Sequence, residues 1–418
     1  MQASFTDWMA LAIFATALVH TFAAKAFERL AHHHPRHAGL LHLLGEVEVV
    51  FGFWAAVLMI AMALAGQGAQ ALAYVESRQY AEPLFVFVVM VIAASRPVLA
   101  AVSSAVSLLA RVLPLPSALS RAWLAFAAVP LAGSLITEPA AMTLAALMLR
   151  DGVFRRGPPE WLKYAALGAL FVNVSIGGTL TSYAAPPVLM VAGTWQWSSG
   201  FMFSQFGWKA ALAVLVNATV VVWLWRRHLR DEPAGAGGAP APVPLLVQAV
   251  HLAFLAATVV FAHHPAVFLG LFLFFLGFTQ AYERHQSPLI LKEGLLVGFF
   301  LAGLVVLGGM QQWWLQPVVS SLGPTQLFFG ALGLTAITDN AALTYLGSLI
   351  EGIAADAKYM LVAGAVAGGG LTVIANAPNP AGVALLRRGF DDESIGAGGL
   401  LAGAALPTVV AAAAYLLL

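Results

Sequence analysis

Long apolar segments dominate this chain and limit its fold more than any other feature. They cover residues 5–24, 41–65, 84–110, 161–192, 207–225, 245–262, 266–282, 293–309, 359–386 and 397–417. A helix needs about 20 apolar residues to cross a bilayer, and these segments have roughly that length. They do not alternate apolar with polar residues, which argues against a transmembrane barrel. The sequence therefore predicts an all-α polytopic membrane protein.

The composition agrees with this prediction and removes several other classes of protein. Only 9% of the 418 residues are charged, too few to cover the surface of a water-soluble globule. The net charge of +1, with no basic face, argues against nucleic-acid binding. The absence of cysteine removes disulfides, thiolate metal sites and cysteine nucleophiles. The bilayer itself is therefore the first partner that the sequence predicts.

Two further apolar stretches, residues 121–150 and 317–350, do not read as single helices. A polar triplet interrupts each one, Thr137–Pro139 in the first and Thr338–Asn340 in the second. Proline lacks a backbone donor and breaks a helix. We predict that both stretches are re-entrant hairpins with the triplets at their tips.

Two of the spans are interrupted as well. Gly177–Thr179 lies within the span 161–192, while Gly368–Gly370 and Asn376–Pro380 lie within the span 359–386. Free backbone survives at membrane depth only where it lines a polar cavity. The breaks therefore predict a polar site inside the membrane.

A Pro/Gly/Ala-rich linker at residues 231–244 divides the chain into two repeats. We expect three spans, a hairpin, a broken span and a final span in each. Five spans per repeat is an odd number, so the repeats would insert with opposite orientations. The predicted parts are residues 1–230, with hairpin 121–150 and broken helix 161–192, and residues 245–418, with hairpin 317–350 and broken helix 359–386.

The two halves also echo each other in sequence. Residues 137–143 (TEPAAMT) align with residues 338–344 (TDNAALT), with an acid matched to an acid. Residues 177–181 (GGTLT) align with residues 368–372 (GGGLT) in the same order. Inverted repeats with matched broken helices are typical of secondary transporters, whose site lies at the breaks near the midplane.

The basic residues indicate the orientation. With both termini outside, Arg78, Lys209 and Lys358 would lie outside, Arg96 within a span, and every other Lys or Arg inside. This asymmetry agrees with the positive-inside rule. The linker 231–244 would then be cytoplasmic, and we expect a multi-pass protein of a bacterial inner (cytoplasmic) membrane.

Three segments carry a resemblance to a known family: Gly133–Ala140, Asn173–Thr181 and Thr338–Asn340. They resemble the sodium/proton antiporters within the ion transporter superfamily, which also holds arsenite, citrate and dicarboxylate carriers. The resemblance covers nearly the whole chain. It implies a mobile transport domain of hairpins and broken helices, a scaffold of the other helices, elevator-type alternating access and a homodimer.

The breaks supply oxygen atoms that suit a hard cation such as sodium. Glu138 and Asp339 are the main candidates, because an acid deep in an apolar segment is costly. Either acid could instead cap a half-helix, and the neutral residues could instead join helices by hydrogen bonds. The candidate ion and proton ligands are Glu138, Asp339, Asn340, Thr137, Thr338, Asn173, Ser175, Thr179, Thr181, Thr372, Asn376 and Asn379.

The favoured function is exchange of sodium, or another monovalent cation, for protons, with no cofactor. The alternatives are an ion-coupled carrier of a small organic or inorganic anion, an intramembrane enzyme using Glu138 and Asp339, and a channel. The long twofold echo is not needed for catalysis and argues against an enzyme. Arg96, Glu46 and Glu48 are charged residues of the spans to which the sequence assigns no role.

Overall fold

The computed structural model describes residues 4–152, 154, 158–229, 242–390 and 393–418, and within these ranges it contains helices and no β-strand. Most of the predicted linker, residues 231–241, lies outside the described part. The helices of the first half are α1 (Phe5–His33), α2 (Ala38–Gly45), α3 (Val47–Met62), α4 (Gly68–Glu76), α5 (Ala81–Ala93), α6 (Arg96–Val112), α7 (Ser117–Phe126), α8 (Ala128–Ile136), α9 (Glu138–Gly152), α10 (Glu160–Gly177), α11 (Pro186–Trp195), α12 (Ser199–Met202) and α13 (Trp208–Trp225).

The helices of the second half follow the linker. They are α14 (Leu245–Val260), α15 (Pro265–Ala281), α16 (Leu291–Gly308), α17 (Gln312–Ser320), α18 (Pro324–Thr335), α19 (Asn340–Ser348), α20 (Ala355–Gly368), α21 (Asn379–Leu386) and α22 (Ala397–Leu417).

Several of these helices are long and apolar enough to cross a membrane. By length and composition, the described residues contain five such helices, or seven if each of two bent pairs counts as one span. The five are Phe5–Ala23, Glu48–Glu76, Ser199–Trp225, Leu291–Gly308 and Ala397–Leu417. The helices α14 and α15 are apolar but shorter. The chain is therefore a multi-pass membrane protein, as the sequence predicts.

Two predicted spans differ from expectation. The segment 41–65 begins in α2 and breaks at Glu46, whose extended backbone separates α2 from α3. The segment 84–110 was expected as one continuous helix, but it consists of α5 and α6, which meet at an angle of 65°. Ser95 is the extended N-cap of α6, and Pro97 lies in the first turn of that helix. Proline fits the first turn because the backbone donor it lacks would be unpaired there. The prediction of a straight span was wrong because Ser-Arg-Pro begins a new helix.

The four predicted interruptions are confirmed as breaks between helices. Thr137 separates α8 from α9, and residues 336–339 separate α18 from α19. The short 3₁₀ turn Gly178–Leu180 and the residues after it separate α10 from α11. Residues 369–378 separate α20 from α21.

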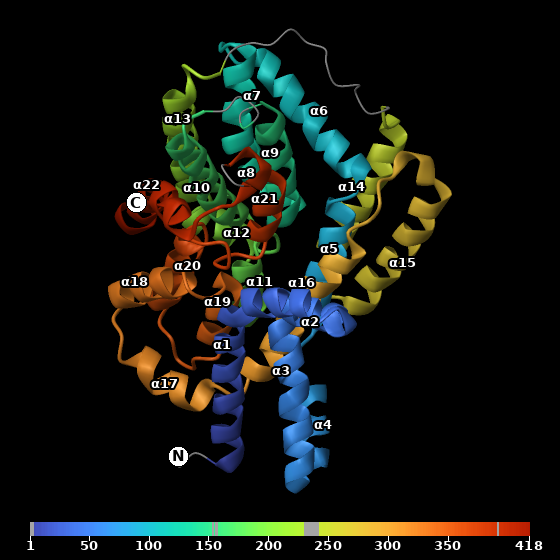
Figure 1. Cartoon of the computed structure of the whole chain (residues 1–418), viewed down its shortest axis with the longest axis vertical. Helices are drawn as coiled ribbons and strands as arrows, with labels where there is room; N and C mark the ends of the chain where they lie inside the picture. The colour runs from blue at the N-terminus through green and yellow to red at the C-terminus, as the bar shows by residue number, and fades with distance from the viewer. Residues whose placement is uncertain (1–3, 153, 155–157, 230–241, 391–392) are drawn as a thin grey trace.

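Buried apolar side chains form two separate cores. Core 1 lies among α7–α10, α13, α18, α20 and α22, the green and orange-to-red part of Figure 1. Core 2 lies among α1, α3, α5 and α14–α16, the blue and yellow part. The helix α6 runs from the α5 side of the molecule to α7.

The two predicted hairpin tips, Thr137 and residues 336–339, reach from core 1 to core 2. Ile136 and Ala140, on either side of the first tip, are members of core 2. So are Ala341 and Ala342, which follow the second tip. The polar breaks therefore lie where the two cores meet.

Candidate functional site

Glu138 is the first residue of α9 and its side chain is fully buried. The preceding residue, Thr137, has a positive φ of 74°, which β-branched residues rarely adopt. This turn ends α8 and starts α9, so Glu138 sits at a helix N-terminus. The partial positive charge of such an end stabilises a carboxylate. Pro139 follows within the first turn, where its missing donor costs little.

Asp339 occupies the corresponding position in the second half, as the N-cap of α19. One carboxylate oxygen accepts hydrogen bonds from the backbone N–H groups of Ala341 and Ala342, at 2.8 and 3.1 Å. The side chain is half-buried. The expected cap is therefore present, but it uses only one of the two carboxylate oxygens.

The break between α20 and α21 joins the two tips. Asn376 donates from Nδ2 to Oε2 of Glu138 at 2.7 Å. The carbonyl of the neighbouring Ala375 accepts from the backbone N–H of Asn340 at 3.1 Å. Two consecutive residues of a third segment thus contact both tips, Glu138 directly and Asp339 through its neighbour Asn340.

Glycines allow the broken spans to approach the tips. A Cβ atom on Gly178 would lie 2.6 Å from Oε1 of Glu138. A Cβ atom on Gly369 would lie 3.0 Å from Nδ2 of Asn340, besides meeting Ser175. These glycines occupy matched positions in the two sequence motifs, and each leaves room for a polar side chain from its own half of the chain.

The hydroxyl groups of the breaks are used mainly to hold the segments together. Five of them donate to a backbone carbonyl at 2.6 to 2.8 Å. The pairs are Ser175 with Val366, Thr179 with Ile176, Thr181 with Ser134, Thr338 with Leu334, and Thr372 with Ala336. Their oxygens keep lone pairs for a ligand, but their protons are committed.

Buried polar atoms without a hydrogen-bond partner gather at the breaks. Among the described residues they include the Oγ1 of Thr137, Oε1 of Glu138, Oδ1 and Nδ2 of Asn340, Oδ1 of Asn376 and Oδ1 of Asn379. All five residues are at most 2% exposed. A buried polar group without a partner costs about 1–3 kcal/mol. Most of these atoms are oxygens, so a cation would satisfy them best.

The predicted amide ligands Asn379 and Asn173 differ in their hydrogen bonds. Asn379 donates from Nδ2 to the carbonyls of Gly369 and Thr372, which leaves its oxygen free at the break. Asn173 uses both ends of its amide, because it donates to the Phe126 carbonyl at 2.8 Å and its Oδ1 accepts from Asn217 at 2.9 Å. Asn173 therefore serves as a link between helices, the alternative that the sequence left open.

Three residues whose side chains contact the broken helices were not predicted from the sequence. Ser134 donates to the Gly177 carbonyl at 2.7 Å and accepts from the Leu180 N–H at 2.9 Å. The phenol oxygen of Tyr415 lies 3.4 Å from Oγ1 of Thr179. Asn217 holds Asn173. A polar residue inside an apolar span was the available signal for Asn217, and Ser134 lies within the motif Gly133–Ala140.

The face of Asp339 toward core 2 borders a small cavity of about 20 Å³. Thr338 lines it from the same tip, and Thr21, Phe51 and Phe300 line it from α1, α3 and α16. A cavity of this size holds about one water molecule.

The sequence assigned no role to Glu46. In the structure it precedes α3 and pairs with Lys292 of α16 at 2.9 Å.

A family model described as "Putative Na+/H+ antiporter" matches residues 5–418 of the chain, which include all four breaks. No curated protein matches the chain.

Proposed function

The chain belongs to this Na+/H+ antiporter family, and from that premise we propose that it exchanges sodium, or a similar monovalent cation, for protons at Glu138 and Asp339. The family is one of transporters rather than enzymes, which argues against an intramembrane protease. The proposed ion ligands are the free oxygens of Thr137, Glu138, Asn376 and Asn379, with Asp339 and Asn340 at the second tip.

A single observation carries the proposal. Helix breaks from both halves of the chain contact the two tips, and the neighbours of Glu138, Thr137 and Asn376, each carry a buried oxygen without a partner. Carboxylate, amide and hydroxyl oxygens are the ligands that hard cations prefer. The half-helix N-termini at α9 and α19 stabilise the ionised acids that would bind such a cation.

The chemistry of exchange follows from burial. A carboxylate taken out of water is unstable unless it is protonated or paired with a cation. A site crossing the membrane therefore carries either a proton or a cation, and an empty ionised site is disfavoured. This restriction couples the two ions and limits leak.

The two cores supply the moving parts of the proposed mechanism. Core 1 contains the broken helices α10 and α20 and most of the first predicted hairpin, whereas core 2 contains α1, α3, α5 and α14–α16. We assign core 1 to a transport domain that slides along a core 2 scaffold, as in elevator-type carriers of the ion transporter superfamily. The matched glycines and acids support inverted repeats at residues 1–230 and 245–418. A homodimer, cytoplasmic basic loops and outward termini complete the proposal.

The test is proton flux in proteoliposomes that contain the purified protein. A sodium gradient should drive opposite proton movement in the parent protein. Glu138→Gln and Asp339→Asn keep size and hydrogen-bonding capacity but cannot ionise, so each should reduce this exchange at least about tenfold. Lowering the pH should weaken apparent sodium affinity in the parent, because protons compete for the same oxygens.

Glu351→Gln is the matched control, since Glu351 is an exposed acid whose carboxylate contacts Gln312 at the surface. It should exchange ions at the parent rate. If both site variants also exchange sodium for protons at the parent rate, the acids are helix caps and the proposal fails. If the parent carries a carboxylate instead of sodium, the protein is an anion carrier.

A further inference from the structure

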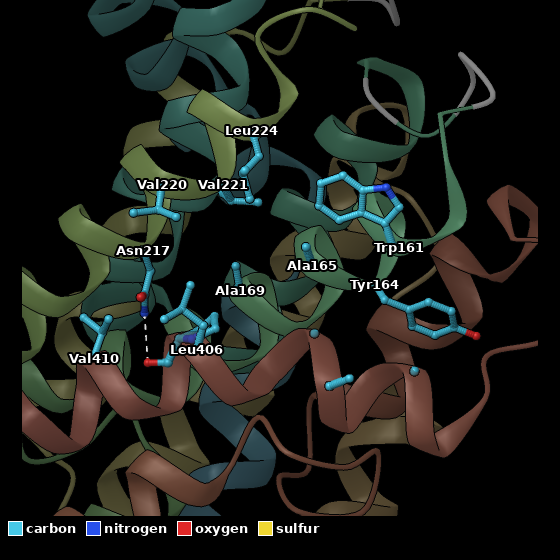
Figure 2. Close-up of a pocket in the computed structure, with 14 residues that line it drawn as sticks. Trp161, Tyr164, Ala165, Ala169, Asn217, Val220, Val221, Leu224, Leu406 and Val410 are labelled. Atoms are coloured by element: carbon cyan, nitrogen blue, oxygen red, sulfur yellow. Dashed lines mark hydrogen bonds between the residues drawn. The ribbon is translucent and has the colours of Figure 1, made fainter.

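A cavity that borders an acid can give protons access to it, and two cavities of this structure differ in that respect. The groove among α10, α13 and α22 has a volume of about 400 Å³, and no acid of the described residues lines it (Figure 2). Its one amide, Asn217, already donates to the Pro407 carbonyl at 3.3 Å. The cavity beside core 2 is far smaller, about 20 Å³, but Asp339, Thr338 and Thr21 line it.

Asp339 keeps an acceptor available beside this small cavity. Both of its backbone hydrogen bonds, from Ala341 and Ala342, go to Oδ1. The cavity holds about one water molecule, and one water is enough to pass a proton between two groups. Access of protons to Asp339 therefore depends on what lies on the other side of the cavity.

The helices α3 and α16 line the cavity on the core 2 side. They contribute Phe51 and Phe300, whose ring centroids are 5.2 Å apart. The start of α3 is joined to the first turn of α16 by the ion pair of Glu46 and Lys292, and the Lys292 side chain is 69% exposed. Five residues separate Glu46 from Phe51, which is about 8 Å along a helix. The cavity thus lies little more than one turn of α3 below the surface.

Glu48 lies in that turn, between the surface ion pair and the cavity. It precedes Phe51 by three residues, so the two share a face of α3. Helix side chains lean toward the N-terminus, which brings the Phe51 ring over the turn that begins at Glu48. Glu48 is half-buried and forms no ion pair within the described part of the chain. Its carboxyl group is therefore not held in the ionised form by a bound base, unlike that of Glu46.

We propose that Glu48 is a proton-relay residue, which passes protons between the surface at Lys292 and Asp339 through the water of the small cavity. The inference rests on the proposed function. Protonated Glu48 donates its proton to the cavity water, which passes one on to the Asp339 carboxylate, and Glu48 then takes a new proton from the aqueous side. The asymmetry of basic residues predicts that this side is the cytoplasm.

The first experiment measures sodium-driven proton flux in proteoliposomes across a range of sodium concentrations. Glu48→Gln removes the proton that is passed on, so the maximal rate should fall at least about tenfold. The sodium KM should stay within about twofold of the parent value, because the substitution leaves Glu138 and its amide neighbours unchanged. Glu48→Asp keeps an acid and should recover at least about half of the parent rate.

Glu293→Gln is the matched control, since Glu293 is an exposed acid in the first turn of α16, next to Lys292. It should exchange ions at the parent rate. A parent-like rate in Glu48→Gln, with an active parent, would overturn the relay alone. An increase in the sodium KM without loss of maximal rate would make Glu48 a cation ligand and would overturn it too. A parent without sodium-driven proton flux would overturn the proposed function and the relay with it.

A second experiment restores the acid chemically and separates its role from folding. The chain has no native cysteine, so Glu48→Cys offers a single thiol. Carboxyethyl methanethiosulfonate attaches a carboxyl group there, whereas propyl methanethiosulfonate attaches a neutral group of similar size. The carboxyethyl adduct should exchange at least about fivefold faster than the propyl adduct. Equal rates of the two adducts would show that bulk rather than the acid matters, and would overturn the relay.

Discussion

Glu138 and Asp339 hold matched positions in sequence but have different neighbours. Glu138 is fully buried and accepts from Asn376, whereas Asp339 is half-buried, caps α19 and borders a cavity beside core 2. The desolvated acid has more to gain from a bound cation or proton. Glu138 is therefore the acid we expect to dominate ion binding, and Asp339 the acid closer to core 2.

Two buried asparagines have different expected roles, Asn376 as an ion ligand and Asn173 as a structural link between helices. We expect Asn376→Ala to raise the KM for sodium about tenfold, because it removes an oxygen of the site and the hydrogen bond to Glu138. Asn173→Ala breaks the link to Asn217 and should lower stability by about 1–3 kcal/mol with little change in the sodium KM. Sodium titrations of proton flux and thermal unfolding in detergent measure these effects. A large sodium KM change in Asn173→Ala would make that residue a ligand.

At the scale of elements, the breaks are built so that helix ends, rather than helix sides, face the acids. Thr137 turns the chain with a positive φ, and α9 then starts directly at Glu138. On the other side the turn Gly178–Leu180 ends α10 against the same carboxyl group. The contact between this turn and the Glu138 carboxyl group therefore needs a residue without a side chain at position 178.

Substitution of Gly178 tests this contact between elements. We expect Gly178→Ala to displace the Glu138 carboxyl group, since the new Cβ would lie 2.6 Å from Oε1. Overpacking of this kind costs about 1–3 kcal/mol, and sodium-driven proton flux should fall with it. Gly270→Ala in α15 is the control, because a Cβ there meets nothing within 4 Å. It should leave flux unchanged and keep or slightly raise the melting temperature, since alanine favours a helix over glycine. Parent-like flux in Gly178→Ala would show that the carboxyl position is not critical.

At the scale of the whole molecule, two hydrophobic cores meet along a surface that contains the tips and α11. The helix α11 contributes Val188 and Val191 to core 1 and Leu189 and Met190 to core 2. A packed boundary between two bodies can slide while each body stays rigid. This boundary is the place where the proposed elevator movement would occur.

A cross-link across this boundary tests the movement. Gly193 of α11 faces Glu82 of α5, with 3.2 Å between a Cβ on Gly193 and Oε1 of Glu82. The chain has no native cysteine, so Glu82→Cys with Gly193→Cys can be joined by a short bifunctional maleimide without background. We expect the joined protein to lose sodium/proton exchange and the unjoined double variant to keep it. The single variants treated with the same reagent are the controls. Full exchange by the joined protein would exclude sliding at this boundary.

The sequence by itself determined the elements and their interruptions. Helices follow from apolar length, and breaks follow from proline, glycine and polar triplets, all of which act within a few residues. For this reason the breaks at Thr137, 336–339, 178–185 and 369–378 were predictable. The bend between α5 and α6 was missed because Ser-Arg-Pro was read as part of an apolar run, although it is also a helix start.

Tertiary structure alone decided which polar groups meet. Asn376 donates to Glu138, which is 238 positions away in sequence, whereas Asn173 accepts from Asn217. Both amides belong to interrupted apolar spans, so composition and spacing do not distinguish them. Partner choice depends on how core 1 packs, because a buried donor takes whichever acceptor the packing brings within about 3 Å. The sequence therefore fixes where polar groups enter the membrane, and the packing of the helices fixes whether they form a site or a support.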